Sequence, residues 1–151
     1  MRFTLTQARA AGDSPNFGLD ALSALAEQGD PEAQTSLGAK YFAGDTPDSA
    51  EAAQLIRRAA ERGVPTAREK LGLMYEEGLG VAQDYAEAAK WYRLAAEQGE
   101  SYSQYGLGRL YFLGLGVSQD RGMAVKLFRQ AAERGLIDAR IMLGLALMFG
   151  D

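Results

Sequence analysis

The sequence predicts an all-α fold, a solenoid built from antiparallel helix pairs. The first observation is an internal repeat: residues 71–99 recur as residues 107–135 at an offset of 36, with 16 identities in 29 positions. The second is that the matched apolar and small residues have helical spacing, with a glycine at each expected helix end. Because a unit of this length cannot bury its apolar face alone, neighbouring units are expected to stack.

The first helix of each unit is expected to bury one apolar face. Ala67, Leu71, Gly72 and Tyr75 stand at i, i+4, i+5 and i+8, which places them on one side of a helix. Gly72 lacks a side chain and would let the neighbouring helix approach closely. Gly78 is expected to end this helix, because glycine readily adopts the left-handed conformation of a C-terminal cap.

The second helix is expected to begin near Asp84, an N-cap residue, with Glu87 three residues later completing an acidic capping box. Asp48 and Glu51 repeat this pair in the preceding unit. The helix is expected to end at Gly99. Its interior face combines aromatic and small side chains, namely Ala88, Trp91, Tyr92, Ala95 and Ala96.

The repeat frame predicts the domain organisation of the chain. Residues 1–16 show no match to the repeat and are expected to form an N-terminal arm or cap, whereas residues 17–151 form the solenoid. The expected units lie at about 31–66, 67–102 and 103–138, with a half unit at 139–151.

The half unit is a first helix without its second, and residues 141–149 are apolar almost all round. Solenoids normally end in a polar cap that shields the last interface. We therefore expect either that the natural chain continues past Asp151 or that the C-terminal helix contacts another chain. In the second case the protein self-associates through this helix.

Residues 67–99 carry the complete string Ala-x3-Leu-Gly-x2-Tyr-x2-Gly-x-Gly-Val-x2-Asp-x3-Ala-x2-Trp-x3-Ala-Ala-x2-Gly. This string resembles the Sel-one-like repeat family, which is related to the tetratricopeptide repeats. The following unit departs from it at Ser103 and Leu127, which replace the first Ala and the Trp, and the preceding unit has a shortened loop at residues 45–47. The resemblance implies a right-handed superhelical solenoid and an adaptor role in signalling complexes, protein quality control or bacterial host and envelope interactions.

The composition argues against several classes of function. The chain has no His and no Cys, so thiol nucleophiles, disulfides, imidazole or thiolate metal ligands and Ser-His or Cys-His catalytic pairs are impossible. We expect no catalytic residue, no metal and no cofactor. The net charge of -4 argues against nucleic-acid binding, and no apolar run reaches the ~18 residues of a membrane span, so no membrane insertion is expected.

The N-terminus lacks the apolar core of a signal peptide, which predicts a cytoplasmic protein. A periplasmic or secreted protein whose signal peptide had been removed would have the same sequence features.

Two glycine pairs are similar to phosphate-binding loops: Gly78 with Gly80, and Gly114 with Gly116. A nucleotide fingerprint requires a preceding strand and a helix directly after the loop. Both pairs instead follow a predicted helix and recur in step with the repeat, which favours a turn.

Neighbouring acids and aromatics also have a structural and a functional interpretation. Glu76 and Glu77 point about 100° apart on a helix, so with Asp84 they are expected to serve as exposed charge and helix caps rather than as an acid–base pair. Trp91 and Tyr92 stand at core positions, where packing is favoured over ligand stacking.

The positions that flank the core stripe of the first helices predict a binding groove. In the third unit they are Tyr102, Tyr105, Arg109 and Phe112, and exposed Tyr with Arg is typical of binding hot spots. The alternative is that Tyr102 and Phe112 pack into neighbouring helices. The equivalent positions of the adjacent first helices are Thr66, Glu69, Leu73, Glu76, Asp138, Ile141, Leu145 and Met148.

These observations predict a protein–protein interaction scaffold that holds a partner protein or peptide on its concave surface. The expected contacts are the four third-unit residues together with Glu69, Leu73, Glu76 and Ile141. Two alternatives remain: an immunity protein that neutralises a bacterial effector, and a structural homo-oligomer. An enzyme is not expected.

Overall fold

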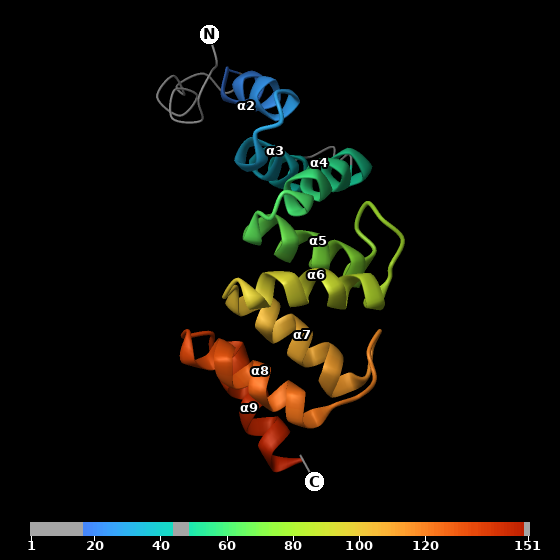
Figure 1. Cartoon of the computed structure of the whole chain (residues 1–151), viewed down its shortest axis with the longest axis vertical. Coiled ribbons are helices and arrows are strands. Elements are labelled where there is room, and N and C mark those ends of the chain that lie inside the picture. Colours follow the sequence, from blue (N-terminus) through green and yellow to red (C-terminus); the bar gives the residue numbers. More distant parts are fainter. Residues whose placement is uncertain (1–16, 44–48, 150–151) are drawn as a thin grey trace.

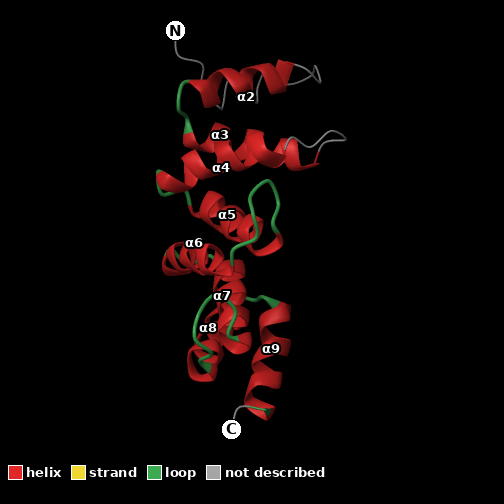
Figure 2. Ribbon diagram, turned by 90° about the vertical axis from the view of Figure 1, so that its right-hand side faces the viewer, coloured by secondary structure: helices red, strands yellow, loops and turns green. Residues whose placement is uncertain are grey.

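The computed structural model describes residues 17–43 and 49–149, and within these ranges it contains helices and no strand (Figures 1 and 2). The prediction of an all-α solenoid is confirmed. The described helices are α2 (Phe17–Glu27), α3 (Pro31–Ala43), α4 (Ser49–Glu61), α5 (Pro65–Glu77), α6 (Tyr85–Glu97), α7 (Ser101–Leu113), α8 (Arg121–Glu133) and α9 (Ile137–Met148).

The helices follow one another along the long axis of the molecule, from α2 at one end to α9 at the other (Figure 1). They pair as α3 with α4, α5 with α6, and α7 with α8, and α9 stands as the first helix of a further unit. The long loops within units, residues 78–84 and 114–120, lie on the same side of the stack. Each unit packs mainly on its neighbours in sequence, as expected of a solenoid.

A glycine of each first helix receives a large side chain from the second helix of the same unit. A Cβ added to Gly72 would lie 2.5 Å from the Tyr92 ring, and one added to Gly108 would lie 2.7 Å from the Phe128 ring. Gly38 and the side chain of Ile56 repeat the arrangement at 2.6 Å. No real Cβ tolerates such distances, so the predicted close approach at glycine is confirmed.

Of the capping box predicted at the start of α6, the structure contains the half that Asp84 provides. The Asp84 carboxylate accepts hydrogen bonds from the backbone N–H groups of Ala86 and Glu87 at 3.0 and 3.1 Å. The reciprocal half of the capping box is absent, because the Asp84 N–H donates to the carbonyl of Tyr75 at 2.9 Å. The expectation for Glu87 was therefore wrong, and its carboxylate lies 3.9 Å from Nζ of Lys90. The equivalent expectation for Asp48 falls outside the described residues.

A polar side chain near the start of α3, α5 and α7 binds the end of the helix before it. Gln34 donates to the Ala26 carbonyl at 3.1 Å, Arg68 to Ala60 at 3.1 Å and Gln104 to Ala96 at 3.4 Å. These carbonyls belong to the last helical turn, whose acceptors lack partners within the helix. The bonds link α2 to α3, α4 to α5 and α6 to α7, and the repeat pattern did not predict them.

The glycine pairs in the long loops serve the fold. Gly114 ends α7 with φ 69°, and Gly116 also has φ 69°. A Cβ on Gly116 would lie 2.3 Å from the carbonyl carbon of Tyr85, at the start of α6. The loop therefore needs glycine to pass the backbone of the preceding unit, which supports the turn interpretation over a phosphate-binding loop.

Helix α9 presents an apolar surface that no described residue covers. Met148 is 76% exposed and Ile137 is 68% exposed. A Cβ added to Gly144, the counterpart of Gly72 and Gly108, would meet nothing within 4 Å. The glycine of the last first helix thus has no side chain packed on it.

The contrast between these glycines gives a direct test of the packing. Gly72→Ala should lower the free energy of unfolding by about 1–3 kcal/mol, because the new methyl collides with a buried ring. Gly144→Ala should raise it by about 0.5–1 kcal/mol, because alanine favours the helix and the methyl meets no atom. Denaturant unfolding measures both, and equal effects at the two positions would contradict the packing described.

Candidate functional site

Six of the eight predicted groove residues line one hollow between α5 and α7, which we call the inner hollow. It has a volume of about 180 Å³. Tyr92 and Gly106 complete its lining. The six predicted residues are Glu69, Leu73 and Glu76 of α5 and Tyr102, Tyr105 and Arg109 of α7.

The walls of the inner hollow combine exposed apolar surface with held charge. Tyr102 is 58% exposed and Leu73 is 44% exposed. The Arg109 guanidinium lies 5.8 Å from the centre of the Tyr105 ring, a cation–π arrangement. The two tyrosine rings and the arginine are of the residue types that binding hot spots use.

Glu76 is the electrostatic centre of this region. Its carboxylate accepts a hydrogen bond from the Tyr92 hydroxyl at 2.7 Å and pairs with Arg109 at 3.1 Å. The residue is buried, with 9% of its surface exposed. The expectation that Glu76 is an exposed charge was wrong, because a hydroxyl and a guanidinium from two other helices replace its contact with water.

Tyr92 reaches Glu76 through a passage made by two glycines. Its ring lies between Gly72 of its own unit and Gly106 of the next, where an added Cβ would be 2.5 and 2.9 Å away. Burial and the hydrogen bond to Glu76 raise the pKa of the Tyr92 hydroxyl, so the hydroxyl keeps its proton. The repeat pattern predicted only a packing role for Tyr92. The signal was Gly106, which stands where the other units have Ser36, Lys70 and Met142.

Glu69 is held in an unfavourable environment. Oε2 of its carboxylate is buried, and no described residue donates a hydrogen bond to it. Burial, followed by repulsion from the Glu100 carboxylate, raises the pKa of Glu69 above its ordinary value of 4.5. A buried carboxylate oxygen without a donor is uncommon in proteins.

Two predicted residues lie elsewhere. Phe112 is half-buried. The centres of the Phe112 and Phe128 rings lie 6.4 Å apart, and the Arg121 guanidinium lies 5.7 Å from the centre of the Phe112 ring. This packing matches the alternative that was considered for Phe112. Ile141 is 57% exposed on α9 and does not line the inner hollow.

Metal-binding clusters and membrane-spanning helices are both absent from the described ranges. They contain no group of three or more acidic residues that could hold a metal ion. No helix among them has the length and apolar character needed to cross a membrane.

The stack of helix pairs, each closed by a glycine against a large side chain, defines an α-solenoid repeat protein. Residues 31–64, 65–100 and 101–136 each match the sequence model of the Sel1 repeat. The chain belongs to the Sel1 repeat family. No curated protein matches the chain.

Solved structures of bacterial Sel1-type proteins share the fold. A protective antigen of uropathogenic Escherichia coli with an SLR fold is 34% identical at a TM-score of 0.88, with 99% of this chain and 37% of that chain covered. A Sel1 repeat protein from Oxalobacter formigenes is 39% identical at a TM-score of 0.74, with 83% and 96% covered. The present chain therefore spans little more than a third of the antigen but nearly all of the Oxalobacter protein.

A third structure, cysteine-rich protein B of Helicobacter pylori, is 24% identical at a TM-score of 0.67, with 87% of this chain and 99% of that chain covered. At this identity the likeness extends to the fold alone.

The Tyr92 hydroxyl should contribute measurably to stability. Tyr92→Phe leaves the ring in place but removes a hydrogen bond to a buried carboxylate, which should cost about 1.5–3 kcal/mol of unfolding free energy. Tyr102→Phe removes a hydroxyl from an exposed ring and should change it by less than about 0.5 kcal/mol. Equal effects of the two changes in denaturant unfolding would contradict the Glu76 network.

Glu69→Gln should stabilise the protein at neutral pH, because it removes a half-buried charge that the Glu100 carboxylate repels. The gain should be only about 0.5 kcal/mol, since solvent screens this repulsion. Because the pKa of Glu69 is higher in the folded than in the unfolded state, ionisation of Glu69 lowers the stability of the fold. The advantage of the variant should therefore be complete above the raised pKa of Glu69 and disappear as the pH falls below 4.5, the ordinary value. Thermal unfolding of both proteins across pH 3.5–8 measures the difference, and a Gln variant that is less stable at pH 7 would contradict it.

Proposed function

We propose that the protein is an interaction scaffold that binds an extended segment of a partner protein in the inner hollow. Proteins of the Sel1 repeat family are generally protein–protein interaction scaffolds. Apart from Tyr92, the lining side chains of the inner hollow lie outside the buried core clusters, so the repeat leaves them free to vary. The lack of His and Cys supports a binding role over catalysis.

The observation that carries the proposal is the Glu69 carboxylate. Its buried oxygen has no donor from the described residues, and its neighbour Glu100 repels it. A carboxylate held in this way weakens the fold, and such a cost is typical of positions kept for function. A cationic group from a partner would supply the missing donor and offset the repulsion.

The rest of the inner hollow favours the same chemistry. Arg109 is paired with Glu76 at 3.1 Å, so its charge is not free to attract an acidic partner. Tyr102 is 58% exposed and lines the inner hollow together with Glu69. The face of its aromatic ring would attract a cation. The partner segment is therefore one that inserts a Lys or Arg side chain between Glu69 and Tyr102, with apolar neighbours against Leu73.

Selection of peptides from a random display library on the immobilised protein tests this proposal. The selected peptides should be rich in Lys or Arg next to an apolar residue. Tyr102→Ala should weaken the binding of the best peptide by about 30-fold, the effect of removing a hot-spot aromatic. Glu69→Gln should weaken it by about tenfold, the typical share of a charge-assisted hydrogen bond.

Glu77→Gln is the matched control, since Glu77 is an exposed carboxylate of the same helix that lies outside the inner hollow. It should leave the affinity unchanged. Arg109→Ala is avoided because it would leave the buried Glu76 carboxylate without its cation. Selected peptides that bind the wild type, Tyr102→Ala and Glu69→Gln equally, with circular dichroism unchanged, would contradict the proposal.

A further inference from the structure

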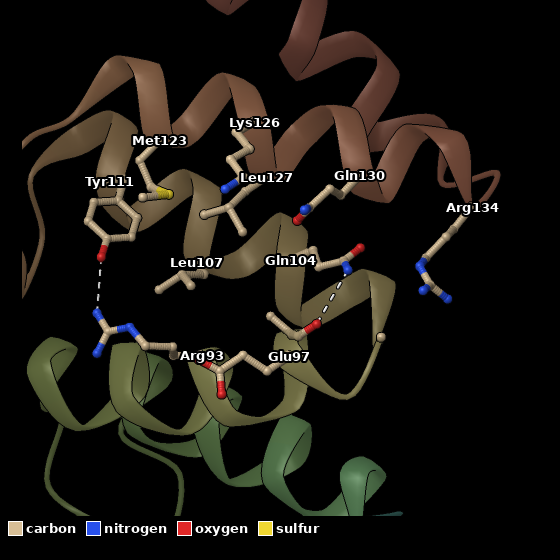
Figure 3. Close-up of a pocket in the computed structure, with 12 residues that line it drawn as sticks. Arg93, Glu97, Gln104, Leu107, Tyr111, Met123, Lys126, Leu127, Gln130 and Arg134 are labelled. Atoms are coloured by element: carbon tan, nitrogen blue, oxygen red, sulfur yellow. Dashed lines mark hydrogen bonds between the residues drawn. The ribbon is translucent and has the colours of Figure 1, made fainter.

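A second and larger hollow lies between α6 and α8, with α7 as its floor, and we call it the outer hollow (Figure 3). It has a volume of about 470 Å³ and shares no lining residue with the inner hollow. Lys126 and Leu127 point into it from α8, opposite Arg93 and Glu97 of α6 (Figure 3). It belongs to a surface that the proposed function does not use.

The outer hollow lies where the third unit has a smaller side chain than the second unit, as the first unit also has at Leu55. Leu127 stands at the position that Trp91 occupies one unit earlier, and Gln130 replaces Leu94. The indole of Trp91 is buried, with 6% exposed, and belongs to the main core cluster together with Leu94. A tryptophan ring is therefore compatible with this place in the unit, and in the third unit the chain does not provide one.

The floor of the outer hollow is apolar. Leu107 and Leu127 are both buried, with 4% and 7% exposed, and Met123 adds a flexible thioether at the edge. Such side chains pack well against the face of an aromatic ring.

Gln104 adds a hydrogen-bond acceptor that has no donor. The residue is 5% exposed and lines the outer hollow. Its Nε2 donates to the Ala96 carbonyl at 3.4 Å, which fixes the orientation of the amide, and its Oε1 is buried without a donor from the described residues. A ring that carries an N–H, as indole does, would satisfy this oxygen.

The rim of the outer hollow is cationic. Arg93, Lys126 and Arg134 surround it against one acid, Glu97. In the described part of the chain none of the three cations forms a salt bridge, although Arg93 donates to the Tyr111 hydroxyl at 3.0 Å. An occupant with acidic groups beside its ring matches this charge.

We propose that the outer hollow binds a tryptophan side chain carried by an acidic segment of a partner protein. The indole N–H donates to Oε1 of Gln104, and the ring packs on Leu107 and Leu127. The flanking carboxylates lie against Arg93, Lys126 and Arg134. The occupant thus supplies from outside the ring that Trp91 supplies within the second unit.

The test is titration of the folded protein with acetylated, amidated Glu-Glu-Trp-Glu-Glu, followed by the amide signals of residues 104–130 in NMR spectra. We expect a Kd of about 0.1–1 mM, since one anchoring side chain and screened charges provide modest affinity. Glu-Glu-Leu-Glu-Glu should bind at least about tenfold more weakly because it lacks the ring and its N–H. Lys-Lys-Trp-Lys-Lys should be weaker by a similar factor because of its charge.

Leu127→Trp should fill the outer hollow from within and weaken the acidic peptide at least about tenfold while the fold is kept, as Trp91 indicates. Lys126→Glu is a second variant at an exposed position and should weaken the peptide about fivefold. Arg129→Glu, exposed on the same helix but outside the lining, is its control and should change the affinity by less than about twofold.

Three results would overturn the proposal. One is that the acidic tryptophan peptide fails to bind at about 5 mM, well above the expected Kd. Another is equal binding of the acidic and basic tryptophan peptides. The third is equal binding to the wild type, Leu127→Trp and Lys126→Glu. Tyr102→Ala, which tests the inner hollow, should leave this binding unchanged, so the two proposals fail separately.

Discussion

The close contact between a glycine of one helix and a large side chain of its partner sets the spacing on which the whole stack depends. At Gly72 and Gly108 a ring lies where a Cβ would have to be. This contact brings the two helix axes close and aligns the remaining apolar positions. The same contact carries Tyr92 across the unit to Glu76, so a packing rule of the fold also holds the polar centre of the inner hollow.

The sequence predicted the fold because the repeat samples one packing solution several times. Sixteen positions match between two units. These matches alone identified the core-facing residues, the glycine contacts and the helix ends. Six of the groove residues could also be placed, because positions that flank a core stripe must face one side of the stack. The unit therefore contained enough information for everything that depends on backbone periodicity.

Several features that the repeat pattern did not predict join different units. The burial of Glu76 depends on its ion pair with Arg109 from the next unit. The raised pKa of Glu69 depends partly on Glu100, which precedes α7. The bond from Gln104 to the Ala96 carbonyl likewise crosses a unit boundary. Glu69 and Glu76 are replaced by Tyr105 and Phe112 in the next unit, so the repeat pattern does not expose their contacts. As a result the two hollows have opposite character, with unsatisfied acid in the inner hollow and unpaired cations around the outer one.

The open surface at Gly144 has a consequence for how the stack comes apart. In a solenoid each unit is held by its neighbours, and α9 has a neighbour on one side only among the described helices. Arg93 donates a hydrogen bond to the Tyr111 hydroxyl of the third unit and so links two units. Leu147 stands at the position equivalent to Tyr111 and has no hydroxyl, so this polar link is missing at α9. Local opening of α9 would uncover Phe128, which α9 helps to bury. The packing of α9 on α8 therefore also governs how readily hydrogen exchange and proteolysis reach this core ring.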